Sequence, residues 1–442
     1  MFRNPSAVGA ATAMFLLLLT ACTEKAVRPE EFPADALIPW NEAIYETALE
    51  DDGLLTLKGL RTASMGYLAA HDALNAVVPL YRTYLPRTES VHADPQAAAV
   101  YAIYAVCAAQ YPEHSAHWDN LLTETLPLQR SEEQLQEARE LGRDIAERLL
   151  QQRQQDGWDG EAEYTWHPMG PGVYAEFNEH SGTPEGFIFG AGWARAKPFL
   201  LESPDAFRAP PPPEIGSSEY AAAFEEVKEL GRDSSATRSP DQAHLALWWK
   251  DFVENSHNRL ARELVQKEGL NLWEAARLFA LLNASIYDAY VNVFDNKFHY
   301  NHWRPYTAIR WASNDGNPDT EEDPDWNNLH GHTYAFPSYP SAHGTASAAA
   351  MTVLAGTLGT GDAYAFEMRT DSVDRAGPFS GKIAMDPPTR SFQSFSGAAM
   401  EAAMSRLYLG IHFRYDSEAG FELGRQIGVY ALTNFLGPAE GQ

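Results

Sequence analysis

The sequence predicts an all-α protein that consists of two helical bundles. Apolar residues recur with the period of a helix over most of the chain, and patterns typical of β-strands are few. A chain of 442 residues, 45% of them hydrophobic, can bury one large core or two ordinary ones. The helical segments lie on both sides of a stretch rich in glycine and proline, which favours two bundles over one.

The first bundle is expected at residues 37–156. Its helical patterns cover residues 44–78, 95–111 and 131–155. Ser131 and the two glutamates that follow it are typical of a helix start. Cys107 lies in an apolar run and is expected to be a buried structural thiol.

A connector is expected at residues 157–217, where the helical pattern gives way to glycine, proline and aromatic residues. Its aromatic content predicts that it packs on the surface of the protein. The second bundle is expected at residues 218–439. Its helical patterns cover residues 219–230, 240–267, 272–294, 341–358 and 396–436.

The N-terminus has the pattern of a targeting segment. Arg3 precedes an apolar run at residues 7–19, and Leu19-Thr20-Ala21-Cys22 resembles the bacterial lipobox. We therefore expect a lipoprotein signal peptide at residues 1–21, a lipidated Cys22 and a tether at residues 22–36. The folded part of the protein would then lie in the periplasm or at the cell surface, anchored to a bacterial membrane. A plain signal peptide or a short membrane anchor is the alternative.

The charge balance argues against a nucleic acid partner. The chain has 33 Lys and Arg against 60 Asp and Glu, which gives a net charge of −27. Any site that binds an anion must therefore depend on a local cluster of positive charge. The acidic segment at residues 315–325 lacks the spacing and the central glycine of a calcium-binding EF-hand, so a solvated loop is the better interpretation.

Three segments of the second bundle concentrate cations and imidazoles. In the first, Lys297 and Arg304 flank an aromatic stretch, and Pro305 disfavours helix at Arg304. A pair of surface cations near aromatic residues is the alternative for this segment. In the second, Ser341, Ala342 and His343 follow two prolines and open a helix of small residues. A helix start offers unpaired N–H groups to an anion.

Two alternatives remain open for the second and third segments. Ser341 can bind the anion or simply cap its own helix. In the third segment, Arg406 and His412 would point about 120° apart on one unbroken helix. Gly410 offers a break that lets them converge, and Asp416 could then orient His412. A structural role is the alternative for His412.

Together these residues are suited to a tetrahedral or trigonal-bipyramidal oxyanion. Lys297, Arg304 and Arg406 supply positive charge, and guanidinium groups favour bidentate contact with such oxygens. The helix start supplies N–H donors, and His343 and His412 remain for chemistry. The second bundle is thus predicted to carry an oxyanion site.

The three patterns Lys-x6-Arg-Pro, Pro-Ser-Ala-His and Ser-Arg-x5-His-x3-Asp occur in this order. They resemble the signature segments of the superfamily of type 2 phosphatidic acid phosphatases and vanadium-dependent haloperoxidases. The resemblance covers residues 272–428 well. The first half of the chain matches the superfamily only in being helical and of suitable length.

The resemblance implies a role for each motif residue. The oxygens of the bound oxyanion would be held by Lys297, Arg304, Ser341, the backbone N–H of Ala342, and Arg406. His412 would be the axial vanadium ligand in a haloperoxidase, or the nucleophile that accepts the phosphoryl group in a phosphatase. His343 would be the acid–base group. The family usually has glycine in place of Ala342, whose methyl group narrows the permitted backbone geometry.

The context favours the bacterial haloperoxidase-like branch. Lipid phosphatases of the superfamily are polytopic, whereas no segment after the N-terminal run has about 18 uninterrupted apolar residues. The soluble acid phosphatases are single bundles that are much shorter than this chain. An acid phosphatase with a phosphohistidine intermediate, or an inactive lipid-anchored binding protein, is the alternative.

The haloperoxidase interpretation implies vanadate as cofactor, and phosphate can occupy the same site. Hydrogen peroxide would oxidise a halide to hypohalous acid, which halogenates a small organic acceptor. His343 would accept a proton from peroxide, and Lys297 would polarise the bound peroxide. Phe336 matches the family position near the halide, although a core aromatic is an equally good interpretation. Membrane contact is expected only through Cys22, and an oligomer is possible.

Overall fold

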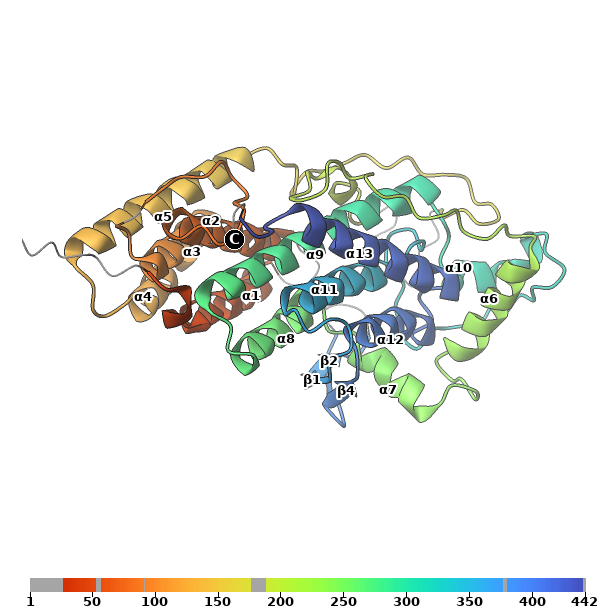
Figure 1. Cartoon of the computed structure of the whole chain (residues 1–442). Helices are drawn as coiled ribbons and strands as arrows, with labels where there is room; N and C mark the ends of the chain where they lie inside the picture. The colour runs from red at the N-terminus through yellow and green to blue at the C-terminus, as the bar shows by residue number, and fades with distance from the viewer. Residues whose placement is uncertain (1–26, 53–56, 91, 176–187, 377–379, 440–442) are drawn as a thin grey trace, which may run out of the picture.

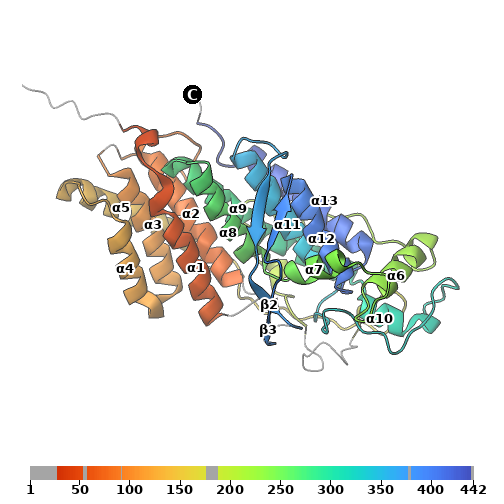
Figure 2. The same ribbon diagram turned by 90° about the horizontal axis from the view of Figure 1, so that it is seen from below.

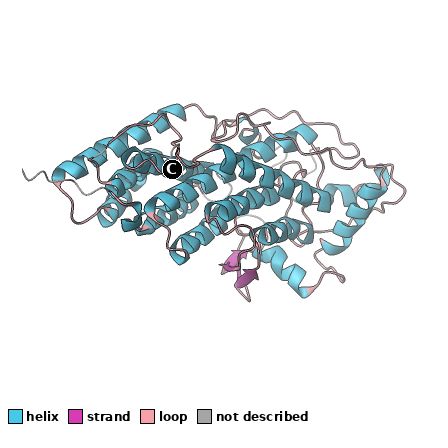
Figure 3. Ribbon diagram, viewed as in Figure 1, coloured by secondary structure: helices cyan, strands magenta, loops and turns pink. Residues whose placement is uncertain are grey.

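The structure is a computed structural model that describes residues 27–52, 57–90, 92–175, 188–376 and 380–439. The expected signal peptide and Cys22 lie outside the described residues. Helices make up most of the described chain, and the few strands gather at one place on its edge (Figure 3). The predicted all-α class is confirmed. Within the described residues, no helix is long and apolar enough to cross a membrane.

The first group of helices lies at one end of the elongated molecule (Figure 1). These helices are α1 (Ile38–Asp51), α2 (Leu57–Val77), α3 (Pro95–Gln110), α4 (Ser115–Thr125) and α5 (Glu132–Gln152). The predicted start at Ser131 is confirmed, because its side chain accepts a hydrogen bond from the backbone N–H of Gln134 and the Gln134 side chain caps Ser131 in return. The prediction of a single helix over residues 44–78 is wrong, because α1 ends at Asp51 and a second helix begins at Leu57.

The remaining helices form the middle and the other end of the molecule. They are α6 (Ser218–Leu230), α7 (Pro240–Trp248), α8 (Val253–Lys267), α9 (Leu272–Tyr300), α10 (Pro305–Arg310), α11 (Ala342–Thr357), α12 (Phe395–Tyr408) and α13 (Arg414–Asn434). The helices α11, α12 and α13 pack against one another, and α9 runs beside them (Figure 2).

One hydrophobic core serves both groups of helices. Helix α9 packs against α2 of the first group and α11 of the second, and the rings of Tyr67 and Phe279 meet between α2 and α9 at 4.8 Å. The same core cluster includes Trp40 of α1, Met351 of α11 and Ile427 of α13. Because this core continues across the bundle boundaries drawn from the sequence, it does not mark where one bundle ends and the next begins. Those boundaries remain predictions.

Two helices expected to be continuous are each broken in two. The pattern over residues 240–267 is divided into α7 and α8, and that over residues 396–436 into α12 and α13. The first break releases the carbonyl of Trp249 from helical bonding, and Arg406 donates a hydrogen bond to it. The second break occurs at Gly410, the residue at which the sequence offered a break. This residue has φ +78°, and a Cβ there would lie 2.4 Å from the carbonyl oxygen of Gly231.

The described part of the connector packs along α9. The Asp288 carboxylate of α9 accepts hydrogen bonds from the backbone N–H groups of Phe199, Leu200 and Leu201. Four short strands, which the sequence patterns did not predict, form two antiparallel pairs before α12. They are β1 (Phe366–Arg369), β2 (Ser372–Asp374), β3 (Lys382–Ala384) and β4 (Thr389–Phe392).

Candidate oxyanion site

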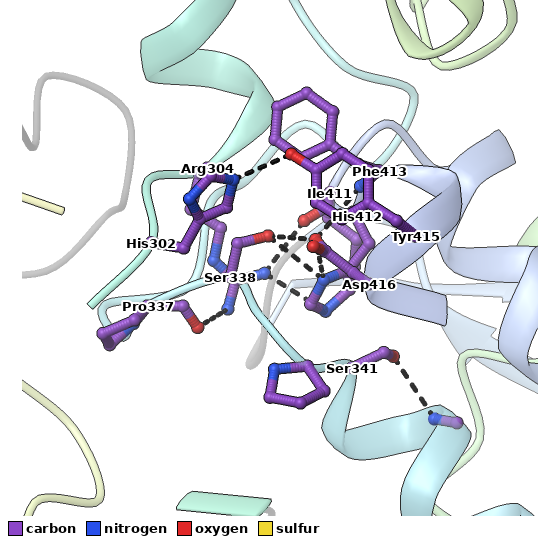
Figure 4. A network of polar contacts seen from close by, with 12 residues as sticks. His302, Arg304, Pro337, Ser338, Ser341, Ile411, His412, Phe413, Tyr415 and Asp416 are labelled. Atoms are coloured by element: carbon purple, nitrogen blue, oxygen red, sulfur yellow. Dashed lines mark hydrogen bonds and ion pairs between the residues drawn. The ribbon is translucent and has the colours of Figure 1, made fainter. Parts of the chain in front are cut away.

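The three predicted segments meet at the inner ends of α9, α11, α12 and α13 (Figure 4). Arg304 precedes α10, whose first residue is Pro305, and therefore has extended backbone, as predicted. Residues 336–341 form a buried loop before α11. Arg406 lies in the last turn of α12, and His412 lies in the turn that leads into α13. The bend at Gly410 brings Arg406 and His412 into the same cluster.

His412 is oriented by the residue four positions after it. The guanidinium of Arg304 approaches the His412 Nε2 atom at 3.3 Å, and guanidinium groups can only donate. Nε2 is therefore the acceptor, and the ring proton lies on Nδ1, which donates to Asp416 Oδ2 at 2.9 Å. Ser338 donates its hydroxyl to the same carboxylate oxygen (Figure 4). The lone pair of Nε2 thus faces the cations.

Arg304 connects the loop before α11 to the turn before α13. Its Nε donates to the carbonyl of Phe336 at 2.9 Å, and its Nη1 donates to the carbonyl of Ile411 at 2.9 Å. Its guanidinium also lies 4.7 Å from the centre of the Phe336 ring. A single buried cation therefore holds two of the three segments together.

Lys297 is buried in the last turns of α9, which continues six residues beyond the predicted end at residue 294. Its ammonium group donates to the carbonyls of Pro337, Ser338 and Pro340 at 3.1, 2.7 and 2.6 Å. All three of its donors are thus directed to the loop before α11. In this structure Lys297 shapes the loop rather than pointing a donor at the space beside His412.

Ser341 is the N-cap of α11, and Ala342 is its first residue. The Ser341 hydroxyl accepts a hydrogen bond from the backbone N–H of Gly344 at 3.3 Å, so the structure shows the capping alternative. The backbone N–H of Ser341 donates to the carbonyl of Asp416 at 2.9 Å. The helix start is thereby fixed beside the residue that orients His412.

Arg406 lies next to the second imidazole. Its Nη2 approaches His343 Nε2 at 3.5 Å and donates to the carbonyl of Trp249, while its Nε donates to Ser405 Oγ at 3.1 Å. The Trp249 ring meets the His343 ring edge to face at 6.5 Å. His343 thus contacts both the Arg406 guanidinium and the Trp249 ring.

Burial and charge keep both imidazoles neutral. Burial lowers the pKa of His412 well below its ordinary value, and Arg304, Lys297 and Arg406 lower it further. Burial and the nearby Arg406 likewise lower the pKa of His343 well below its ordinary value. Burial lowers the pKa of the Arg304 and Arg406 guanidinium groups to about 10. Both groups therefore still carry positive charge at neutral pH.

Oxyanion binding should strengthen as the pH falls. A bound anion offsets the charge of the cations, which raises the pKa of His343 and His412, so that binding takes up protons. Sulfate suits this test because its own charge does not change in the range. We expect the affinity for sulfate to rise as the pH falls, by at most about tenfold per pH unit for each proton taken up. Calorimetry between about pH 5 and pH 8 measures this dependence. His343→Ala should reduce this dependence. A sulfate affinity independent of pH would contradict the account.

The structure adds residues to the site that the motifs did not single out. Ser338 contacts His412 and Asp416 from the loop before α11, and Trp249 contributes its carbonyl from the break between α7 and α8. The acidic loop is occupied by its own hydrogen bonds, such as the one from Thr320 Oγ1 to Asp315 Oδ2 at 2.8 Å. Across the described ranges, no group of three or more His, Cys, Asp or Glu side chains could hold a metal ion.

Comparison with known proteins gives consistent results. Residues 277–440 match the family described as the VCPO second helical-bundle domain. Vanadium chloroperoxidase of Curvularia inaequalis is 27% identical over 252 residues, which cover 46% of this chain and 41% of that protein. The chain thus spans less than half the length of the curated relative that it matches.

Two solved structures share the fold. A bacterial vanadium-dependent iodoperoxidase superposes with a TM-score of 0.74 at 21% identity, over 95% of this chain and all of that one. The holo form of a bacterial vanadium-dependent chloroperoxidase superposes with a TM-score of 0.64 at 18% identity, over 86% of this chain and 92% of that one. Together these comparisons support the resemblance of residues 277–440 to the superfamily of vanadium-dependent haloperoxidases and type 2 phosphatidic acid phosphatases.

Proposed function

We propose that the protein is a vanadate-dependent haloperoxidase, which oxidises a halide with hydrogen peroxide to hypohalous acid and so leads to halogenation of a small organic acceptor. The arrangement of His412 carries this proposal. Its Nε2 lone pair faces the guanidinium of Arg304, and its Nδ1–H is held by Asp416. An imidazole fixed in this tautomer is suited to act as a ligand to vanadium.

The residues present fit the proposed cofactor. Arg304 and Arg406 supply two buried charges for the vanadate oxygens, and the start of α11 at Ala342 supplies backbone donors. Lys297 would act mainly by shaping the loop, since its three donors engage carbonyls. When bound, vanadate would supply a Lewis-acid centre that activates hydrogen peroxide toward a halide.

His343 is the residue best placed to move a proton. Because Arg406 can only donate, the His343 Nε2 that it approaches is the acceptor nitrogen and carries no proton. The low pKa of His343 keeps this nitrogen available at neutral pH. His343 would take a proton from hydrogen peroxide at Nε2 and return it later in the cycle.

Anchoring of the enzyme through a lipidated Cys22, in the periplasm or at the surface of a bacterial cell, is also part of this proposal. It rests on the lipobox-like segment before that residue. Incorporation of a labelled fatty acid into the wild type, but not into Cys22→Ala, tests it.

The activity is tested with purified apo-protein. Vanadate should switch on peroxide-dependent oxidation of iodide, bromide or chloride, and phosphate should suppress it by competing for the same cations. A generic phosphate ester is assayed in parallel. Turnover of the ester alone would identify the phosphatase instead. Vanadate binding without turnover of either substrate would identify an inactive binding protein.

A further inference from the structure

A short turn at residues 328–332 lies beside the candidate site and is fixed from two sides. The backbone N–H of Leu329 donates to the carbonyl of Gly231 at 3.0 Å, and that of His330 donates to the carbonyl of Leu409 at 3.2 Å. Leu409 lies in the turn between Arg406 and His412. Within the turn, the side chain of Asn328 donates to the carbonyl of His332 at 2.9 Å. The position of His330 relative to the site is therefore well defined.

His330 is a buried polar side chain without a polar partner. It is 2% exposed, and neither ring nitrogen has a hydrogen-bond partner among the described residues. A neutral imidazole always carries one N–H, so a buried donor is left unpaired. Such a donor costs about 1–3 kcal/mol, and a buried group of this kind calls for an explanation.

A column of stacked rings leads from His330 to the candidate site. The rings of His330 and Tyr334 lie 5.3 Å apart at 28°, and those of Tyr334 and Phe336 lie 5.3 Å apart at 27°. The guanidinium of Arg304 lies 5.7 Å from the centre of the Tyr334 ring. Tyr334, the middle ring of the column, and the neighbouring His332 are partly exposed, so the column meets the protein surface at Tyr334, between the buried His330 and the buried Phe336.

The surroundings of His330 favour an anion. Burial lowers the pKa of His330 well below its ordinary value, and the nearby Lys250, His332, Arg406 and Arg304 lower it further. The imidazole stays neutral and still has one N–H to donate. Lys250 is held at the end of β2, since it donates to the carbonyl of Asp374, the last residue of that strand, and to that of Ala376 at 2.7 Å. A mobile anion would thus find positive charge and a free donor together.

We propose that His330 donates its unpaired ring N–H to the halide substrate, and that the column of rings forms the wall along which the halide reaches the oxyanion site. This proposal rests on the proposed function and names a further binding residue for it. A single N–H donor beside aromatic rings suits a monovalent, weakly hydrated ion. Affinity should therefore rise from chloride to bromide to iodide, since larger ions lose less hydration free energy on burial.

The experiment measures iodide binding by calorimetry without vanadate or peroxide, and then iodide turnover with both. His330→Phe keeps a ring for stacking but removes the donor, whereas His330→Gln restores a donor. We expect His330→Phe to weaken iodide binding and raise KM for iodide by roughly tenfold or more, with a smaller effect on kcat. His330→Gln should recover part of both. His299→Ala, which removes an exposed imidazole of α9, is the matched control and should change neither.

The outcomes separate this inference from the proposed function. If halide oxidation is present but His330→Phe changes neither the iodide affinity nor KM, the inference is wrong and the proposed function stands. If iodide binding depends on His330 but no halide is oxidised, the anion site stands and the haloperoxidase is wrong. Should His330→Phe fail to fold, as judged by its circular dichroism, His330→Leu takes its place as the variant without a donor, and iodide affinity equal to that of the wild type would again overturn the inference.

Discussion

Replacing His412 with alanine is expected to abolish vanadate-dependent halide oxidation. Nε2 of His412 is an acceptor and faces Arg304. Asp416 accepts a hydrogen bond from Nδ1 and so keeps the ring proton on that nitrogen. Loss of a residue that merely orients a metal ligand costs about 10-fold to 100-fold in metal affinity. Loss of the ligand itself should cost on the order of 100-fold or more. Vanadate binding by equilibrium dialysis and turnover at saturating vanadate measure the two effects separately.

The control for this variant must show that the fold survives. His299→Ala again serves as the matched change on an exposed imidazole and should behave as the wild type. Free imidazole, which fits the space left by the side chain, should restore part of the turnover of His412→Ala. A His412→Ala variant that binds vanadate and turns over normally would refute the assignment of this residue.

Replacing Arg304 with alanine is expected to affect both stability and anion binding. The guanidinium satisfies the carbonyls of Phe336 and Ile411 and lies 1% exposed between them. Its removal leaves these buried acceptors without donors and should lower the free energy of unfolding by about 3–5 kcal/mol. The same variant should lose measurable sulfate and vanadate binding. Denaturant unfolding and calorimetry check the two results.

A lysine at this position separates geometry from charge. Arg304→Lys keeps a positive charge but cannot reach both carbonyls with a planar fork, so it should recover part of the anion affinity and little of the stability. Arg310→Ala, which removes a partly buried arginine of α10 six residues away, is the control. An Arg304→Ala variant with unchanged unfolding and unchanged sulfate affinity would show that this arginine has neither role.

Local patterns predicted most of the helices in the second half but not where each of them ends. The helical pattern over residues 396–436 runs across Gly410, and this residue could be recognised as a place for a break only because glycine permits a positive φ. The break between α7 and α8 had no such local cause. It frees the carbonyl of Trp249 for Arg406, which lies 157 residues further along the chain. The helices α4 and α10 and the four short strands carried no pattern strong enough to predict them.

The motifs name residues that the structure brings into contact in two pairs, but they do not assign every contact. Arg304 lies against His412, and Arg406 lies against His343. The role of Lys297 differs in detail, because its ammonium is occupied by three loop carbonyls. Which carbonyls a buried ammonium meets depends on the path of a distant loop, and no spacing within one segment encodes that path.

By itself, the sequence determined the helical class, the start of a helix after Ser341 and the place at Gly410 where a break was possible. These features follow from side chains and backbone preferences within a few residues of one another. The tertiary structure alone decided that Ser338 donates to Asp416 beside His412, that one core joins both groups of helices, and that His330 lies beside the site with no hydrogen-bond partner among the described residues. Such contacts join segments far apart in the chain, and only the packing of the whole core brings those segments together.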